Sequence, residues 1–221
     1  YIVKEVSSPQ YYSVSDEEVT VYLEHEGQIV QIEFLNESVY TNVSIGKSGY
    51  TEVVPGQEIR YTFKDIANNS TVPLDSFYWR DTLPTDAVRL DKIITGTYSA
   101  RLNYKVVFQT NLSNTQRVLA DNLNTLQNYT LDASPAALGL ASNEYVTQVT
   151  FLFGRVPGGF RQVETPYIYC DVLSDLPHEY RFANKCDVGG MWRNQWIQAT
   201  DRWVTIIYRG GPVPTLPRTG Y

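Results

Sequence analysis

A lysine, an aspartate and an asparagine lie on the apolar faces of three strand-like segments. Residues two apart in a strand share a face. By this rule one polar side chain falls among apolar ones in each of the segments 43–47, 77–83 and 182–188, at Lys47, Asp81 and Asn184 respectively. An unpaired ammonium or carboxylate is very costly to bury, so we expect these groups to meet one another or to change protonation.

An amine, an acid and a carboxamide in an apolar interior can react. Desolvation lowers the pKa of a lysine and raises that of an aspartic acid. A neutral Lys47 amine would attack the side-chain carbonyl of Asn184, while protonated Asp81 polarises that carbonyl and shuttles protons. Loss of ammonia would leave a Lys–Asn isopeptide bond. Periodicity alone equally allows an ordinary Lys47–Asp81 ion pair, or strand ends that reach solvent.

Conventional catalytic and metal sites have no signature in this sequence. Its two His and two Cys do not group at the spacings of zinc ligands. There is no GxSxG, HExxH or glycine-rich phosphate loop. We therefore expect no metal, no cofactor and no turnover enzyme, and at most a cross-link that forms once per molecule.

Cys170 and Cys186 both fall on apolar faces, sixteen residues apart on strands that we expect to be neighbours. An extracellular location permits a disulfide between them. The sequence does not supply their separation in space. A disulfide and two buried free thiols therefore both stay open.

The composition favours strands. Aromatic residues make up 13% of the 221 residues, 17 of them Tyr, and Gly and Pro number 14 and 11; ring and β-branched side chains suit a pleated, half-buried surface. The net charge of −6 argues against a nucleic-acid partner. No stretch approaches the ~18 consecutive apolar residues of a membrane span, so we expect no membrane partner for this segment.

Short alternating runs separated by turn signals predict an all-β antiparallel sandwich. The predicted strands are 19–23, 29–34, 40–47, 58–63, 76–81, 90–94, 102–109, 146–153, 167–172, 182–188 and 203–208. The segment 117–141, with leucines at 119, 123 and 126, predicts a short helix and a loop.

Strand counting predicts a division of the chain into three parts. Residues 1–41 supply only about three strands, too few for a core of their own, whereas 42–208 make a comfortable single sandwich. Residues 209–221 are Pro-rich and predict an extended linker. The start at Tyr1, without Met or a signal peptide, is interpreted as a cut inside a longer protein.

The segment 1–12 (YIVKEVSSPQYY) resembles the E-box of collagen-adhesin B-type domains of Gram-positive surface proteins and pilins, with Tyr11 where that family usually has Gly. The resemblance implies that Glu5 is the catalytic acid and that Asn36, in the last strand, is the acceptor of a lysine. The lysine-bearing first strand has no counterpart in this sequence. Residues 1–41 would therefore be the C-terminal part of such a domain.

The body of the chain resembles the immunoglobulin-like conserved-repeat domains of bacterial wall proteins, on the motifs VPGQEIRY at 54–61 and RDTLP at 80–84. Related A-type adhesin domains form Lys–Asn bonds assisted by an acid on an intervening strand. Lys47, Asp81 and Asn184 follow that order, with Asp65 as the rival acid.

The residues Leu216, Pro217, Arg218, Thr219 and Gly220 match the sortase signal L-P-x-T-G, after a Pro-rich stretch. The match implies that sortase is a partner and that Thr219 becomes joined to peptidoglycan or a pilus subunit. We therefore expect an extracellular, cell-wall-anchored stalk or pilin-like module. The alternative is an adhesin module that binds a host protein or glycan.

Overall fold

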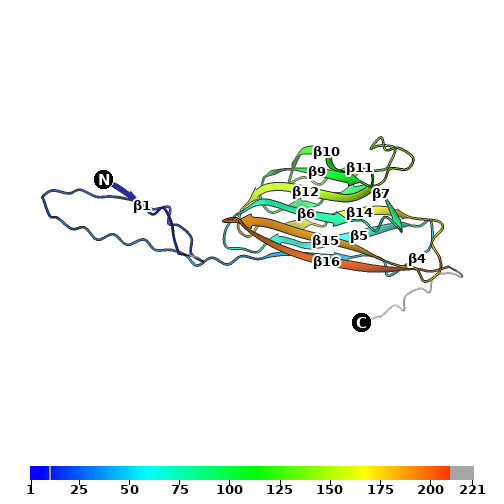
Figure 1. Ribbon diagram of the computed structural model, residues 1–221, viewed down its shortest axis with the longest axis horizontal. Coiled ribbons are helices and arrows are strands. Elements are labelled where there is room, and N and C mark those ends of the chain that lie inside the picture. Colours follow the sequence, from blue (N-terminus) through cyan, green and yellow to red (C-terminus); the bar gives the residue numbers. More distant parts are fainter. Residues whose placement is uncertain (10, 210–221) are drawn as a thin grey trace.

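The computed structural model describes residues 1–9 and 11–209, and the regular structure of these residues is entirely β (Figure 1). Two sheets pack face to face. The larger has seven strands, in the order β10 (Ser113–Asn124), β9 (Asn103–Thr110), β12 (Val146–Val156), β6 (Leu74–Thr82), β15 (Arg181–Trp192), β16 (Gln195–Ile207) and β4 (Glu52–Val53). The smaller has the order β11 (Thr130–Asp132), β7 (Val88–Ile94), β14 (Tyr167–Val172), β5 (Glu58–Asn68) and β3 (Val43–Ser48).

Strand pairing is antiparallel throughout both sheets except between β16 and β4. A short ladder joins β8 (Thr97–Tyr98) to β13 (Gln162–Glu164), and another joins β1 (Ile2–Lys4) to β2 (Glu18–Thr20). The predicted all-β antiparallel sandwich, preceded by a few further strands, is confirmed.

Two local predictions were wrong, and one predicted strand is shorter than expected. The segment 117–141 holds no helix but forms β10 and β11, because leucines four residues apart satisfy a strand period as well as a helical one and β9 supplies a hydrogen-bonding edge. The predicted strand 29–34 has no sheet partner, and the strand predicted at 19–23 shortens to β2.

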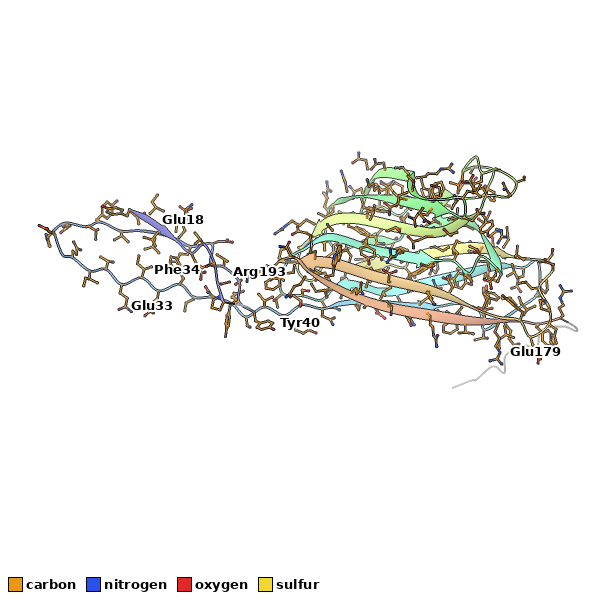
Figure 2. The ribbon with its side chains drawn as sticks, viewed as in Figure 1. Glu18, Glu33, Phe34, Tyr40, Glu179 and Arg193 are labelled. Carbon is orange, nitrogen blue, oxygen red and sulfur yellow. The ribbon has the colours of Figure 1, made fainter. Side chains whose placement is uncertain are left out.

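Residues 1–39 reach out from one end of the sandwich (Figures 1 and 2). They meet the sandwich at the β15–β16 turn, where Arg193 Nη2 donates a hydrogen bond to Ser8 Oγ at 2.8 Å. Large apolar side chains along the segment, such as Ile29 and Leu35, are exposed. The division of the chain at residue 41 stays a prediction, and the predicted sortase signal at 216–220 lies outside the described residues.

An aromatic cluster fills the space between the sheets. Trp79 of β6 is fully buried and stacks on Phe151 of β12, with ring centroids 3.9 Å apart. Its ring also meets Phe63 of β5 at 4.8 Å, and its Nε1 donates to the Tyr98 hydroxyl at 2.9 Å. Trp79 therefore links strands of both sheets.

Replacing Trp79 by Ala should lower the free energy of unfolding by about 3–5 kcal/mol, because the change leaves a large cavity in the core. Trp196→Ala is the matched control: this ring is 57% exposed, so its loss should cost under about 0.5 kcal/mol. Urea unfolding followed by far-ultraviolet circular dichroism measures both. Equal midpoint shifts for the two variants would contradict this account of the core.

Candidate functional site

Three strands from two sheets bring Lys47, Asp81 and Asn184 together. Lys47 lies on β3, the edge strand of the smaller sheet, whereas Asp81 and Asn184 lie on the adjacent strands β6 and β15 of the larger sheet. Asp81 pairs in register with Cys186 of β15, and the two side chains lie on the same face of the sheet. Asn184 is two residues before Cys186 in β15, so its side chain also points to the inward face. The backbone N–H of Lys47 donates to Asp201 Oδ2 of β16 at 2.7 Å, which ties β3 to the opposite sheet.

The Asp81 carboxyl contacts both of the other groups. Lys47 Nζ lies 2.6 Å from Asp81 Oδ1, and Asn184 Nδ2 donates to Asp81 Oδ2 at 3.2 Å. The side chains of Lys47 and Asp81 have no exposed surface, and Asn184 is fully buried. Asn184 Oδ1 is a buried acceptor without a hydrogen-bond partner among the described residues. One carboxyl thus holds an amine and a carboxamide side by side.

Aromatic rings enclose the amine. Lys47 Nζ lies 3.8 Å from the centroid of the Phe63 ring and 4.8 Å from that of Tyr61, both on β5. The ring faces attract the Lys47 ammonium weakly by cation–π interaction and keep water and other polar groups away from it. Burial accordingly raises the pKa of Asp81; the nearby Lys47 cation and the hydrogen bonds from Lys47 and Asn184 oppose this rise without cancelling it.

Tyr61 is a member of the site that the sequence analysis did not single out. Burial raises the pKa of its phenol, with smaller contributions from Cys170 and Asp81. The Asn184 and Thr205 side chains oppose this rise in the pKa without cancelling it. No hydrogen bond of normal geometry satisfies the Tyr61 hydroxyl within the described part of the chain. The sequence feature that could have identified Tyr61 is its position two residues from Phe63, on the apolar face of the same predicted strand.

The other side chains predicted near this site lie elsewhere or stay unreactive. Asp65, the rival acid, is exposed. Cys170 and Cys186 are both free and buried, so the disulfide alternative is wrong; they lie on β14 and β15, which belong to different sheets and are not neighbours. Burial raises the pKa of Cys186 to about 12 and that of Cys170 well above its ordinary value, so both remain thiols.

The acid and amide predicted in the N-terminal segment also meet. Asn36 Nδ2 donates to Glu5 Oε1 at 2.8 Å, and the backbone N–H of Ser15 donates to Glu5 Oε2 at 2.7 Å. The Ser15 hydrogen bond and then the Asn36 hydrogen bond lower the pKa of Glu5. Asn36 Oδ1 has no partner among the described residues, and Lys4 pairs with Glu18 instead.

The described residues form neither a metal site nor a membrane-spanning helix. Residues 1–9 and 11–209 contain no group of three or more His, Cys, Asp or Glu side chains arranged to hold a metal ion. Over the same ranges there is no helix with the length and apolar character of a membrane span.

Comparison with known proteins gives fold-level likeness only. No protein-family model and no curated protein matches the chain. Similar solved structures include AvmM, which catalyses macrocyclization in alchivemycin A biosynthesis (7% identity, TM-score 0.31, covering 79% of this chain and 93% of that one). Another is the collagen-binding domain from a Staphylococcus aureus adhesin (10% identity, TM-score 0.30, covering 78% and 99%).

A third is AggA, the major subunit of aggregative adherence fimbriae type I from Escherichia coli (7% identity, TM-score 0.27, covering 80% of this chain and 99% of that one). One of the three therefore belongs to an adhesin and one to fimbriae. Similarity at these identities and TM-scores carries no argument about a ligand, a partner or a reaction.

Proposed function

We propose that this chain is a structural, stalk- or pilin-like module of a surface protein, stiffened by an isopeptide bond between Lys47 and Asn184. The observation that carries the proposal is the shared carboxyl: Asp81 contacts the Lys47 amine at 2.6 Å and the Asn184 amide at 3.2 Å, away from solvent. This is the arrangement that the reactants of an amide transfer need, because the reacting groups are held in place before the bond forms.

The proposed reaction conserves atoms and charge. Lys47 passes a proton to Asp81, and its neutral amine attacks the Asn184 side-chain carbonyl carbon, so a C–N bond forms while the carbonyl oxygen takes up the electron pair. Protonated Asp81 gives its proton to the Asn184 nitrogen, which it already contacts, and then takes the second proton from the Lys47 nitrogen, so that Asp81 ends protonated. The electron pair on the oxygen re-forms the carbonyl. The carbon–nitrogen bond of the original amide breaks and ammonia leaves. The raised pKa of Asp81 favours this role, since a buried acid accepts the proton more readily.

Tyr61 completes the proposed mechanism. Asn184 Oδ1 and the Tyr61 hydroxyl are both buried without a hydrogen-bond partner among the described residues, and the Tyr61 ring lies 4.8 Å from Lys47 Nζ. Negative charge grows on Oδ1 as the amine attacks, and a donor placed beforehand in a buried site stabilises such charge strongly. In this proposal Tyr61 therefore acts on the transition state, whereas Asp81 moves the proton.

The bond would connect the two sheets. It joins β3 of the smaller sheet to β15 of the larger sheet, across most of the chain. A covalent link over so long a loop restricts the unfolded chain, and the loop-entropy relation used for disulfides gives about 5 kcal/mol. It forms once per molecule, so the chain is not proposed to be a turnover enzyme.

We further propose that the chain is anchored outside the cell by sortase, which would join Thr219 to peptidoglycan or a pilus subunit. The support is the LPRTG sequence at 216–220 and the Pro-rich stretch before it. This proposal is independent of the cross-link.

Intact mass measures the cross-link. We expect the wild-type chain to be one ammonia lighter than its formula, and Asp81→Ala and Lys47→Ala each to regain that mass. Asp65→Ala is the matched control, because this aspartate is exposed; the variant should keep the lighter mass. A wild-type mass equal to the formula would rule the bond out.

Tyr61→Phe should slow the loss of ammonia at least tenfold during refolding of unlinked chain, since the variant removes a donor to the developing oxyanion but keeps the ring. Tyr104→Phe is the matched control: its hydroxyl is also buried and unpaired within the described residues, but its ring packs on Phe151 and Phe153 instead of beside Lys47. Time-resolved intact mass gives both rates. Equal rates for the two variants would remove Tyr61 from the mechanism without affecting the bond.

A further inference from the structure

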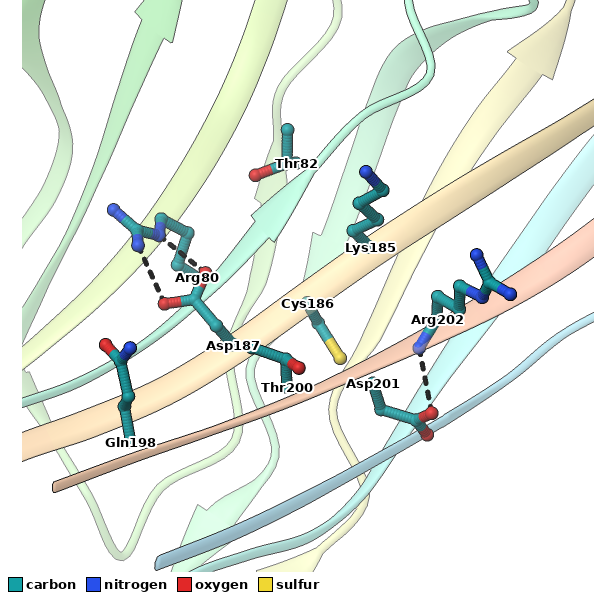
Figure 3. Close-up of a pocket in the computed structure, with 9 residues that line it drawn as sticks. All are labelled: Arg80, Thr82, Lys185, Cys186, Asp187, Gln198, Thr200, Asp201 and Arg202. Atoms are coloured by element: carbon teal, nitrogen blue, oxygen red, sulfur yellow. Dashed lines mark hydrogen bonds and ion pairs between the residues drawn. The ribbon is translucent and has the colours of Figure 1, made fainter.

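We propose that the outer face of β6, β15 and β16 binds an acidic polysaccharide, whose sulfate or carboxylate groups are held by Lys185 and Arg202. These side chains line an open groove of about 610 Å³ on the face opposite the Lys47 site. Figure 3 shows both extending from neighbouring strands toward the same side of the groove. The inference is independent of the proposed cross-link.

Two like charges stand directly opposite each other in this groove. Lys185 of β15 pairs in register with Arg202 of β16, and such cross-strand like charges destabilise a sheet. Neither side chain makes an ion pair in the portion of the chain that the structure covers, residues 1–9 and 11–209. The chain as a whole is acidic, with a net charge of −6. Two unpaired cations facing each other are therefore unusual for its surface. An anion bound between the two would relieve the repulsion.

The acids nearest to the pair are already engaged. Asp187 accepts two hydrogen bonds from Arg80, at 2.7 and 2.8 Å, and one from the Tyr78 hydroxyl at 2.8 Å. Asp201 accepts the backbone N–H groups of Lys47 and Arg202, at 2.7 and 2.8 Å. The geometry therefore leaves the positive charges of Lys185 and Arg202 available to an external anion.

The same face continues with groups suited to a sugar chain. Arg202, Thr200, Gln198 and Trp196 alternate along β16 on this face and are all exposed; from Arg202 to Trp196 they span roughly 20 Å at about 3.3 Å per residue. Trp196 is 57% exposed and stands edge-to-face with Tyr78, with ring centroids 6.3 Å apart. Hydroxyl and amide groups can bond sugar hydroxyls, and the aromatic ring offers an apolar face to a sugar ring. This length suits a polymer rather than a single small ligand.

An acidic peptide fits this face less well. Peptides commonly gain affinity by adding a strand to a free sheet edge. Both β6 and β15 have hydrogen-bonded neighbours on each side, so the groove above them offers side chains alone. The open groove also lacks the enclosure typical of a small-molecule cavity.

The test uses heparin, a sulfated polysaccharide, as the probe, with neutral dextran and poly-glutamate as comparison ligands. In isothermal titration calorimetry at physiological salt, we expect wild type to bind heparin and neither comparison ligand, and Lys185→Gln/Arg202→Gln to weaken binding at least tenfold. Heparin affinity should fall as salt rises, because exposed charges are screened. The double variant should keep or raise the melting temperature, since it removes a repulsion.

Arg101→Gln/Lys105→Gln is the matched control: it removes the same two kinds of exposed cation away from the groove and should bind heparin within twofold of wild type. Trp196→Ala should weaken binding several-fold if the sugar chain runs along β16. The proposal is overturned if wild type fails to bind heparin, if the two double variants weaken binding equally, or if Trp196→Ala binds as wild type does. Poly-glutamate binding as tight as heparin would overturn it in favour of an acidic peptide.

Discussion

The buried contact between Lys47 and Asp81 is the constraint around which the sandwich is arranged. Removing one partner from such a pair typically costs about 3–5 kcal/mol, because the remaining charge is left without compensation. The pair therefore holds β3 against the larger sheet, and the hydrogen bond from the Lys47 backbone to Asp201 of β16 holds β3 in the same place. Asn184 adds a third group to this ion pair, because its side-chain amide donates a hydrogen bond to the same Asp81 carboxyl.

The N-terminal segment contains a similar acid–amide contact without an amine. Glu5 and Asn36 meet at 2.8 Å, and Asn36 Oδ1, like Asn184 Oδ1, has no partner in the described residues. The environments differ: hydrogen bonds lower the pKa of Glu5, whereas burial raises that of Asp81. Only the second carboxyl is thus poised to take up a proton, which is why the proposed chemistry is assigned to the sandwich.

Strand periodicity was enough to predict the sandwich and the inward positions of Lys47, Asp81 and Asn184, because a period of two assigns faces without knowledge of strand order. It could not predict which strands adjoin: Cys170 and Cys186 were expected on neighbouring strands but lie in different sheets. Nor could it identify Tyr61, whose place in the site depends on the pairing of β5 with β3, which brings its ring beside Lys47. The edge strand β10 was mistaken for a helix because its pairing with β9 is a tertiary interaction.

The most direct test of the central claim is tandem mass spectrometry of a proteolytic digest of the unaltered chain. The account predicts a branched peptide in which the segment containing Lys47 is joined to the segment containing Asn184, with one ammonia lost. Fragment ions should locate the link on the Lys47 Nζ and the Asn184 side chain. Quantitative recovery of the two segments as separate, unmodified peptides would contradict it.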